Sequence, residues 1–545
     1  MLISSTHKLV LLRRKLSLLV ASISSHIASK DSADALSITC VNNCYKYLFL
    51  RSKIIGFKRL DDDYQEVVMH QSHMFINGEQ VISLSGKTEI IRNPANQEPV
   101  AKVAVGSRQD ARLALEAAKR AFPIWSATSC QGRAEILHSA ADLVRQRAEG
   151  IAMLLTQEMG KPLKNAKMEV LSSADVLDFY AEEGKRNFGE WISSSHSRSI
   201  VLRQPVGVAA LITPWNFPVD LLAWKVGPAL AAGCTFVAKP PSKAPLAATE
   251  FVRAVSDAGL PAGAANVVHG PGSEVGAELV ENPISRKIAF TGETQTGCEI
   301  MARAAAHIKR VSLELGGQSP FIVCADADLE AAAAAAAQRA FSNMGQICIS
   351  VNRIYVAAEV AEPFTEELVR RAQRLKIGDG MQPDVDLGPM FSRAQRQRTK
   401  EHVADAVEKG AELLTGGQEP EGEAYEKGYF FLPTVLGGAD HRMRVMREET
   451  FGPVAPIMEF KTLDEAVTLA NDSEYGLAAY VFTNDLKMAL RAAEGLEAGG
   501  VGVNVNNVVD LQAPFGGWKE SGLGRELGHY GLEAYLETKH IRLGM

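Results

Sequence analysis

The stretch VGVAALITPWNFP, residues 206–218, indicates the architecture of this chain. It is a short apolar run that ends in proline and asparagine, which is typical of a buried strand that breaks into a loop. The pattern recurs at 234–241, 266–272 and 287–292, and helical sequences such as 245–260 lie between these segments. Strands and helices that alternate in this way predict a parallel sheet with helices on both faces. Ligands of such sheets bind at the carboxyl ends of the strands.

A second unit of the same kind follows. Residues 326–341, DADLEAAAAAAAQRAF, predict a helix whose acidic start favours the helix dipole. This helix leads into NMGQICIS, a polar turn that contains Cys348. Strand and helix patterns continue at 352–375 and 463–484, so we expect a second α/β unit. No sequence repeat or low-complexity linker occurs after residue 72, and we therefore expect closely packed domains.

Composition limits the classes of function. The 545 residues exceed the roughly 250–300 residues of a single core, so several domains are expected. A net charge of -6 gives no electrostatic reason for nucleic acid or an anionic membrane as a partner. No apolar run approaches the roughly 18–20 residues of a membrane helix. Seven scattered cysteines predict neither a disulfide framework nor a metal site, and they favour a reducing, cytoplasmic location: Cys40, Cys44, Cys130, Cys234, Cys298, Cys324 and Cys348.

The N-terminal segment 1–72 differs from the rest. Its first 30 residues contain no acid, several bases, many serines and a short apolar stretch, which is a pattern found in targeting segments. No clear cleavage site follows that stretch, and Met74 begins the first regular segment, MFINGEQV. We therefore expect residues 1–72 to be an extension that is disordered or dispensable, although targeting remains an alternative.

Polar residues follow several predicted strands. Asn216 lies in a loop where its amide could stabilise an oxyanion, and Lys239 lies where an ammonium could reach a ribose or phosphate. Gly292 and Gly297 flank a strand-to-helix turn suited to phosphate binding, and Glu314 stands among leucines, which raise a carboxyl pKa. Each signal is weak alone, because turn residues, solvated charges and small buried cysteines are common.

The order of these signals is specific. PWNFP, ELGGQSP, NMGQIC, FGPVAP and PFGGWKESGLGRE follow one another along the chain, and from about Met74 to the C-terminus it resembles the aldehyde dehydrogenase superfamily. Within that superfamily, the motifs are most similar to those of the succinate-semialdehyde dehydrogenase branch. The resemblance implies an α/β fold with a Rossmann-type cofactor domain, an α/β catalytic domain and a small β extension for oligomerisation. It divides the chain into 73–187 with 208–315 (cofactor), 316–522 (catalysis), and 188–207 with 523–545 (oligomerisation strands).

The resemblance also implies roles for single residues. Cys348 would attack the aldehyde to form a thiohemiacetal, and hydride transfer to NAD or NADP would leave a thioester. Glu314 would activate the water that hydrolyses it, while the Asn216 amide and the Cys348 backbone N–H hold the oxyanion. Lys239 and Glu449 would hold the two riboses, with Phe451 beside the nicotinamide. The full implied cofactor set is Trp215, Lys239, Ser242, Gly272, Gly292, Glu293, Gly297, Glu449 and Phe451.

Two departures from the family pattern concern the cofactor. Ser242 stands where members that prefer NAD often carry glutamate, which accepts from the ribose hydroxyls and repels a 2′-phosphate. A neutral serine beside Lys243 removes this repulsion and adds a cation, so we expect NADP or dual use. Glu293 replaces a commoner serine near the expected pyrophosphate, and nothing in the sequence explains it.

The substrate positions also depart from the nearest branch. That branch binds a substrate carboxylate with two arginines, and the matching residues here are Trp224 and Ser342. The implied tunnel is apolar, which suits a neutral aliphatic or aromatic aldehyde: Phe217, Leu221, Trp224, Ile347, Ile349, Val509 and Phe515. Succinate semialdehyde remains an alternative, and so does an amino-aldehyde if Asp220 or Asp510 faces the tunnel mouth.

Functions of other classes fit the sequence less well. A cysteine acyltransferase would need a histidine, and none occurs in the motif loops. Glu314 favours water over coenzyme A as the acyl acceptor, and a non-catalytic binding protein would not need Cys348, Glu314 and Asn216 together. Extended segments 199–207 and 535–544 have the alternation of bridging strands, so we expect a homodimer or homotetramer.

Overall fold

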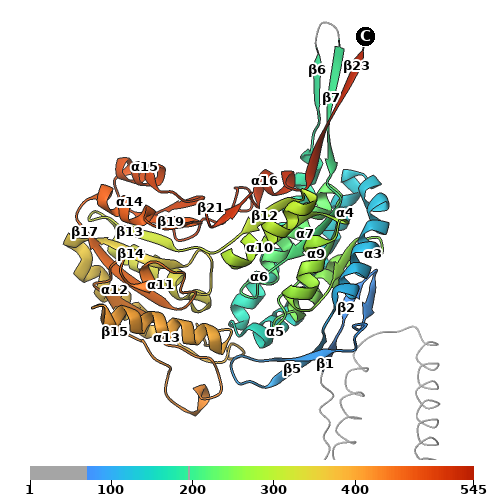
Figure 1. Cartoon of the computed structure of the whole chain (residues 1–545). Helices are drawn as coiled ribbons and strands as arrows, with labels where there is room; N and C mark the ends of the chain where they lie inside the picture. The colour runs from blue at the N-terminus through green and yellow to red at the C-terminus, as the bar shows by residue number, and fades with distance from the viewer. Residues whose placement is uncertain (1–69, 194–196, 545) are drawn as a thin grey trace, which may run out of the picture. The chain divides into compact units, whose positions relative to one another are not determined.

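The computed structural model describes residues 70–193 and 197–544 (Figure 1). The predictions for segment 1–72, for Cys40 and Cys44, and for the last residue of the tail lie largely or wholly outside these ranges. Two large sheets organise the described residues, and each has helices packed against it. No helix within the described ranges is long and apolar enough to cross a bilayer.

The first sheet confirms the predicted parallel arrangement. Its five central strands are parallel neighbours, and three short strands add antiparallel edges. In spatial order the strands are β22 (Gly522–Leu523), β12 (Arg310–Glu314), β11 (Ser285–Thr291), β8 (Val208–Ile212), β9 (Thr235–Lys239), β10 (Ala265–Val267), β2 (Met74–Ile76) and β3 (Glu79–Val81).

Helices cover both faces of this sheet because its strands are apolar on both sides. Along β8, Ala209 and Leu211 join one buried cluster, whereas Val208, Ala210 and Ile212 join another. The surrounding helices are α3 (Arg108–Ala127), α4 (Cys130–Gln146), α5 (Ala148–Met159), α6 (Leu163–Glu183), α7 (Asp220–Ala232), α8 (Leu246–Asp257), α9 (Ala277–Glu281) and α10 (Thr294–Ala304).

The second sheet has seven strands, parallel apart from one antiparallel edge strand. Its spatial order is β15 (Glu412–Thr415), β16 (Thr434–Gly437), β17 (Val454–Phe460), β14 (Val351–Ala357), β13 (Ser319–Val323), β19 (Ala478–Phe482) and β20 (Gly500–Val503). Its helices are α11 (Leu329–Phe341), α12 (Ala361–Arg374), α13 (Arg393–Glu408), α14 (Leu463–Asn471) and α15 (Leu486–Gly495). β12 ends at Glu314 and β13 begins at Ser319, so only four residues connect the two sheets here.

Smaller strand groups complete the fold. β6 (Glu190–Ser193), β7 (Ser197–Pro205) and β23 (Leu536–Gly544) form an antiparallel ribbon that projects from the helices in Figure 1. The two segments predicted to be extended therefore pair with each other inside this chain, and bridging to a neighbour stays a prediction. The remaining elements are β1 (His70–Ser72), β4 (Thr88–Arg92), β5 (Pro99–Ala104), β18 (Tyr475–Gly476), β21 (Trp518–Lys519) and α16 (Gly528–Glu533).

Candidate active site

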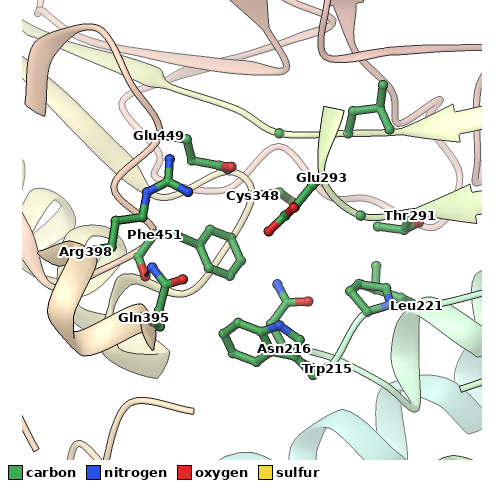
Figure 2. Close-up of a pocket in the computed structure, with 14 residues that line it drawn as sticks. Trp215, Asn216, Leu221, Thr291, Glu293, Cys348, Gln395, Arg398, Glu449 and Phe451 are labelled. Atoms are coloured by element: carbon green, nitrogen blue, oxygen red, sulfur yellow. Dashed lines mark hydrogen bonds between the residues drawn. The ribbon is translucent and has the colours of Figure 1, made fainter. Parts of the chain in front are cut away.

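Cys348 lines a cavity of about 110 Å³ at the carboxyl ends of the first sheet. Loops after three neighbouring strands, β8, β11 and β12, form one side, and residues from the second sheet and from α13 form the other. Figure 2 shows the Phe451 ring and the Glu293 carboxylate directed into the space beside Cys348. The lining residues are Pro214, Trp215, Asn216, Leu221, Thr291, Gly292, Glu293, Leu315, Gly316, Cys348, Gln395, Arg398, Glu449 and Phe451.

The loop that carries Cys348 has an unusual backbone. Asn343, Met344 and Gly345 are all left-handed, with φ of 51°, 59° and 67°. A non-glycine residue in this region costs about 1 kcal/mol or more, so the loop is held by its surroundings. A Cβ on Gly345 would lie 2.2 Å from the carbonyl oxygen of Gly452, which requires glycine there. The chain therefore reaches Cys348 through a fixed turn rather than a flexible loop.

The Cys348 thiol is protonated in the resting protein. Burial raises its pKa to about 12, and the negative charges of Glu449 and Glu314 add to this effect. A thiolate forms only when a base takes the proton or when a positive charge enters the cavity. Glu314 is close enough to act on this thiol electrostatically.

Glu314 ends β12 with 3% of its surface exposed. Burial raises its pKa well above the ordinary value, and the neighbouring Glu526 raises it further. Neither of its carboxylate oxygens has a hydrogen-bond partner among the described residues. A buried carboxylate without a partner is uncommon, and it is free to accept a proton from a thiol or from water.

Beside Glu314 lies a buried ion pair, Lys225 with Glu526, which the sequence did not predict. Lys225 Nζ is 2.8 Å from Glu526 Oε1 and donates to Thr291 Oγ1 at 2.7 Å. Lys225 could have been noticed, because it is a charged residue within the apolar helix α7 and is fully buried. Within this pair the Glu526 carboxylate adds to the rise of the Glu314 pKa, whereas the Lys225 ammonium opposes it.

The Asn216 amide is fixed from two sides. Its Nδ2 donates to the Gln346 carbonyl at 3.1 Å, and its own backbone carbonyl accepts from Lys161 Nζ at 2.8 Å. Lys161 in turn forms a buried ion pair with Glu169. An amide nitrogen carries two hydrogens, so one remains for a ligand oxygen in the cavity that Asn216 shares with Cys348.

The Glu449 side chain lies against Gly316 and Gly317 and lines the cavity. Its Oε1 accepts from the Gly317 N–H at 3.0 Å, and burial raises its pKa to about 7. A Cβ on Gly316 would lie 2.9 Å from Glu449 Oε2, and one on Gly317 would lie 2.3 Å from the Cys348 carbonyl oxygen. The pair of glycines in ELGGQSP is thus required by close packing between the two sheets.

Aromatic rings form one wall of the cavity. The Trp215 and Phe391 rings stack with centroids 4.2 Å apart, and Phe451 meets Trp215 edge-on at 5.5 Å. Such a wall suits a planar aromatic ligand ring. Gln395 and Arg398 of α13 also face this space, and sequence reasoning missed them because α13 carries no motif.

Lys239 fits the hydroxyls or phosphate of a nucleotide. It is 7% exposed, and burial lowers its pKa to about 8. Among the described residues its Nζ donates only to the Pro240 carbonyl, at 3.3 Å. A buried ammonium without an acidic partner is expensive unless a ligand supplies acceptors. Lys239 does not line the Cys348 cavity, but it ends β9, the strand next to β8, and the aromatic wall and Glu449 of that cavity are compatible with a pyridine dinucleotide.

The two residues next to the expected adenosine end both have partners within the chain. Ser242 Oγ donates to the Gly270 carbonyl at 2.8 Å and lines a second cavity. Lys243, which was expected to add a cation near a 2′-phosphate, has its ammonium paired with Glu89. β4 brings Glu89 to this position from 154 residues away, so the pairing is invisible in the local sequence.

Two predicted glycines lie outside the cavity lining. Gly297 lies inside α10, where a Cβ would be 2.5 Å from the Leu315 side chain, so packing explains the need for glycine. Gly272 begins an exposed turn, and a Cβ there would meet no atom within 4 Å.

Three of the predicted substrate residues lie on α7 or just before it: Phe217, Leu221 and Trp224. Leu221 lines the cavity, Trp224 meets Phe515 edge-on at 5.2 Å, and Lys161 Nζ lies 3.9 Å from the Phe217 ring centre. Ile347 and Ile349 are buried on either side of Cys348, and Val509 is partly buried in the loop before Phe515.

The charged and polar positions of this region are more scattered. Burial raises the pKa of Asp220 to about 7, and its Oδ1 has no partner among the described residues. Ser342 lies in a separate groove that Arg371 and Arg374 also line. No group of three or more His, Cys, Asp or Glu side chains in the described ranges could hold a metal ion, and the five cysteines there are free thiols.

Known proteins share this arrangement. A model described as "Aldehyde dehydrogenase family" matches residues 82–541. The chain is 43% identical to a succinate-semialdehyde dehydrogenase [NADP(+)] of Escherichia coli, over 88% of this chain and 98% of that protein. It is 41% identical to a betaine aldehyde dehydrogenase of Bacillus subtilis, over 86% and 96%. A crystal structure of a betaine aldehyde dehydrogenase from Staphylococcus aureus in complex with NAD+ superposes with a TM-score of 0.85 at 37% identity, over 87% of this chain and 95% of that one.

Proposed function

Because the chain belongs to the aldehyde dehydrogenase family and is an NAD(P)-dependent aldehyde dehydrogenase, we propose that Cys348, Glu314 and Asn216 carry out its reaction. The observation that supports this most is the shared placement of three groups. A thiol and a fixed amide line one cavity, and a buried, unpartnered carboxylate raises the pKa of that thiol.

The first step forms a carbon–sulfur bond. Glu314 takes the thiol proton, and the Cys348 sulfur attacks the carbonyl carbon of the aldehyde to give a thiohemiacetal. The free Asn216 N–H and the Cys348 backbone N–H donate to the developing oxyanion. The bound nicotinamide supplies the hydride acceptor, and hydride loss leaves a thioester on Cys348.

The second step consumes water. Glu314 first releases the thiol proton to solvent. It then takes a proton from a water molecule, which attacks the thioester carbon while Asn216 again holds the oxyanion, and it returns this proton to the leaving Cys348 sulfur. Collapse releases the carboxylic acid and the Cys348 thiol. Aldehyde, NAD(P)+ and water therefore give acid, NAD(P)H and a proton.

Cofactor and substrate proposals follow from particular side chains. A neutral Ser242 lacks the charge that would repel a 2′-phosphate, which supports NADP or dual use. The apolar surroundings of Leu221, Trp224 and Phe515 support a neutral aldehyde. A short semialdehyde acid is the second candidate, because the E. coli relative is named for one and Arg374 lines the groove of Ser342.

We also propose the residue division given by the family pattern, with the ribbon of β6, β7 and β23 serving a homodimer or homotetramer. Its exposed Trp191 and Ile192 support this, since side chains of this type are usually covered by a partner. A cytoplasmic location is proposed from cysteine usage.

The test is reduction of NAD and of NADP with a panel of aliphatic, aromatic, amino- and carboxy-aldehydes. Cys348→Ala should abolish turnover with every aldehyde, whereas Cys130→Ala, at the start of α4, should keep it. Turnover that survives Cys348→Ala would overturn the assignment of the nucleophile. Fastest turnover of succinate semialdehyde would favour the second candidate.

A further inference from the structure

A cavity of about 550 Å³ lies beside Ser242, apart from the one that holds Cys348. Strands β4 and β5 form one side, and the segments after β9 and β10 form the other. Its lining residues are Lys87, Thr88, Glu89, Val103, Ala104, Val105, Ser242, Lys243, His269, Gly270 and Pro271. Glu89 is the one acid among these described residues.

The charged side chains that line this cavity leave one net positive charge. Lys243 is paired with Glu89, and Lys87 supplies a second cation. His269 adds no positive charge near neutral pH, because burial lowers its pKa to about 4. Without Glu89 the cavity would hold two cations and no acid.

The Glu89–Lys243 pair can exchange partners at little cost. The Lys243 side chain is 63% exposed and that of Glu89 is 36% exposed. Exposed ion pairs contribute little to stability, so an incoming phosphate oxygen can replace the carboxylate as the partner of Lys243. The carboxylate that remains would then repel the phosphate, which carries up to two negative charges.

We propose that Glu89 limits the preference of this enzyme for NADP by competing with the 2′-phosphate for Lys243. This rests on the proposed binding of the adenosine end beside Ser242. The family pattern directs attention to Ser242, three residues after Lys239, whereas here a strand far away in sequence supplies the acid. Ser242 removes one carboxylate from the ribose, and Glu89 places another within reach of the same phosphate.

The test uses fragments that differ only in the phosphate. Binding of 2′,5′-ADP and of 5′-AMP to the full chain is measured by titration calorimetry for wild type, Glu89→Gln and Lys243→Gln. Glu98→Gln is the matched control, because Glu98 is exposed just before β5 and does not line the cavity. The same variants are then compared by kcat/KM for NADP and NAD with one aldehyde.

Glu89→Gln should tighten the binding of 2′,5′-ADP by about five- to tenfold and leave the binding of 5′-AMP unchanged. The ratio of kcat/KM for NADP to kcat/KM for NAD should rise by the same factor. Lys243→Gln should weaken the binding of 2′,5′-ADP by about tenfold, and both effects should become smaller as the salt concentration is raised. Unchanged 2′,5′-ADP binding in Glu89→Gln, or an equal change for 5′-AMP, would overturn the inference.

The outcomes also separate this inference from the proposed function. If the wild type reduces cofactor but the ratio is the same in Glu89→Gln, only the role of Glu89 fails. If neither fragment binds, the placement of the adenosine end beside Ser242 fails with it. If Cys348→Ala keeps turnover, the proposed mechanism fails whatever the fragments show.

Discussion

Replacing Glu314 by glutamine separates the two halves of the reaction. The substitution keeps the volume of a side chain that is 3% exposed, and it breaks no hydrogen bond, because neither carboxylate oxygen has a partner among the described residues. The fold should therefore be preserved. Only the ability to accept a proton is lost, and general bases typically contribute about 10²–10⁴-fold.

The expected result is a burst. With Glu314→Gln, the first turnover should still give one NAD(P)H per active site, more slowly than in wild type. The steady-state rate should then fall by about 10²–10⁴-fold, because hydrolysis of the thioester is slow without a general base. Stopped-flow absorbance of the reduced nicotinamide measures both phases, and mass spectrometry detects the acyl group on Cys348.

The pH profile gives a second readout of the same residue. A general base works as the carboxylate, and burial raises the pKa of Glu314. In wild type kcat should therefore fall as pH decreases through this raised pKa, where the carboxylate becomes protonated. Glu314→Gln should lose this dependence, and the exposed control Glu299→Gln should keep it. A steady-state rate within threefold of wild type, or no acyl group on Cys348, would refute the role of Glu314.

Three further predictions concern packing and charge. Gly317→Ala places a methyl group 2.3 Å from the Cys348 carbonyl oxygen, so kcat should fall at least tenfold while circular dichroism stays unchanged; wild-type kcat would contradict the role of this close approach. Glu293→Ser removes a carboxylate directed into the cavity, and dinucleotide binding measured by calorimetry should tighten, less so at high salt; equal or weaker binding would show that Glu293 does not face the ligand. Lys161→Met leaves the buried Glu169 without its partner, so urea unfolding should show a loss of about 3–5 kcal/mol; a loss below about 1 kcal/mol would mean that the pair is not buried in solution.

Local sequence was enough for the elements that carry the chemistry. The short runs at β8, β9 and β11 are largely apolar because both faces of the parallel sheet are buried. The helix 326–341 was expected from its periodicity and acidic start, and α11 occupies Leu329–Phe341 with Asp328 as its cap. The family motifs then indicated Cys348, Glu314 and Asn216.

Other members of the site could not be found in this way. Gln395 and Arg398 lie on α13 without a motif, and they matter only because the second sheet places that helix against the cavity. Lys225 and Glu526 meet across 301 residues. No local pattern encodes such a contact.

The sequence by itself determined the family and the two parallel sheets and predicted the nucleophile, because periodicity and motifs are properties of short segments. The tertiary structure decided the charge states. Cys348 is protonated because it is buried near Glu314 and Glu449, and Lys243 is paired because β4 brings Glu89 to it. Burial and long-range pairing set a pKa and a net local charge, and both depend on which distant segments pack together.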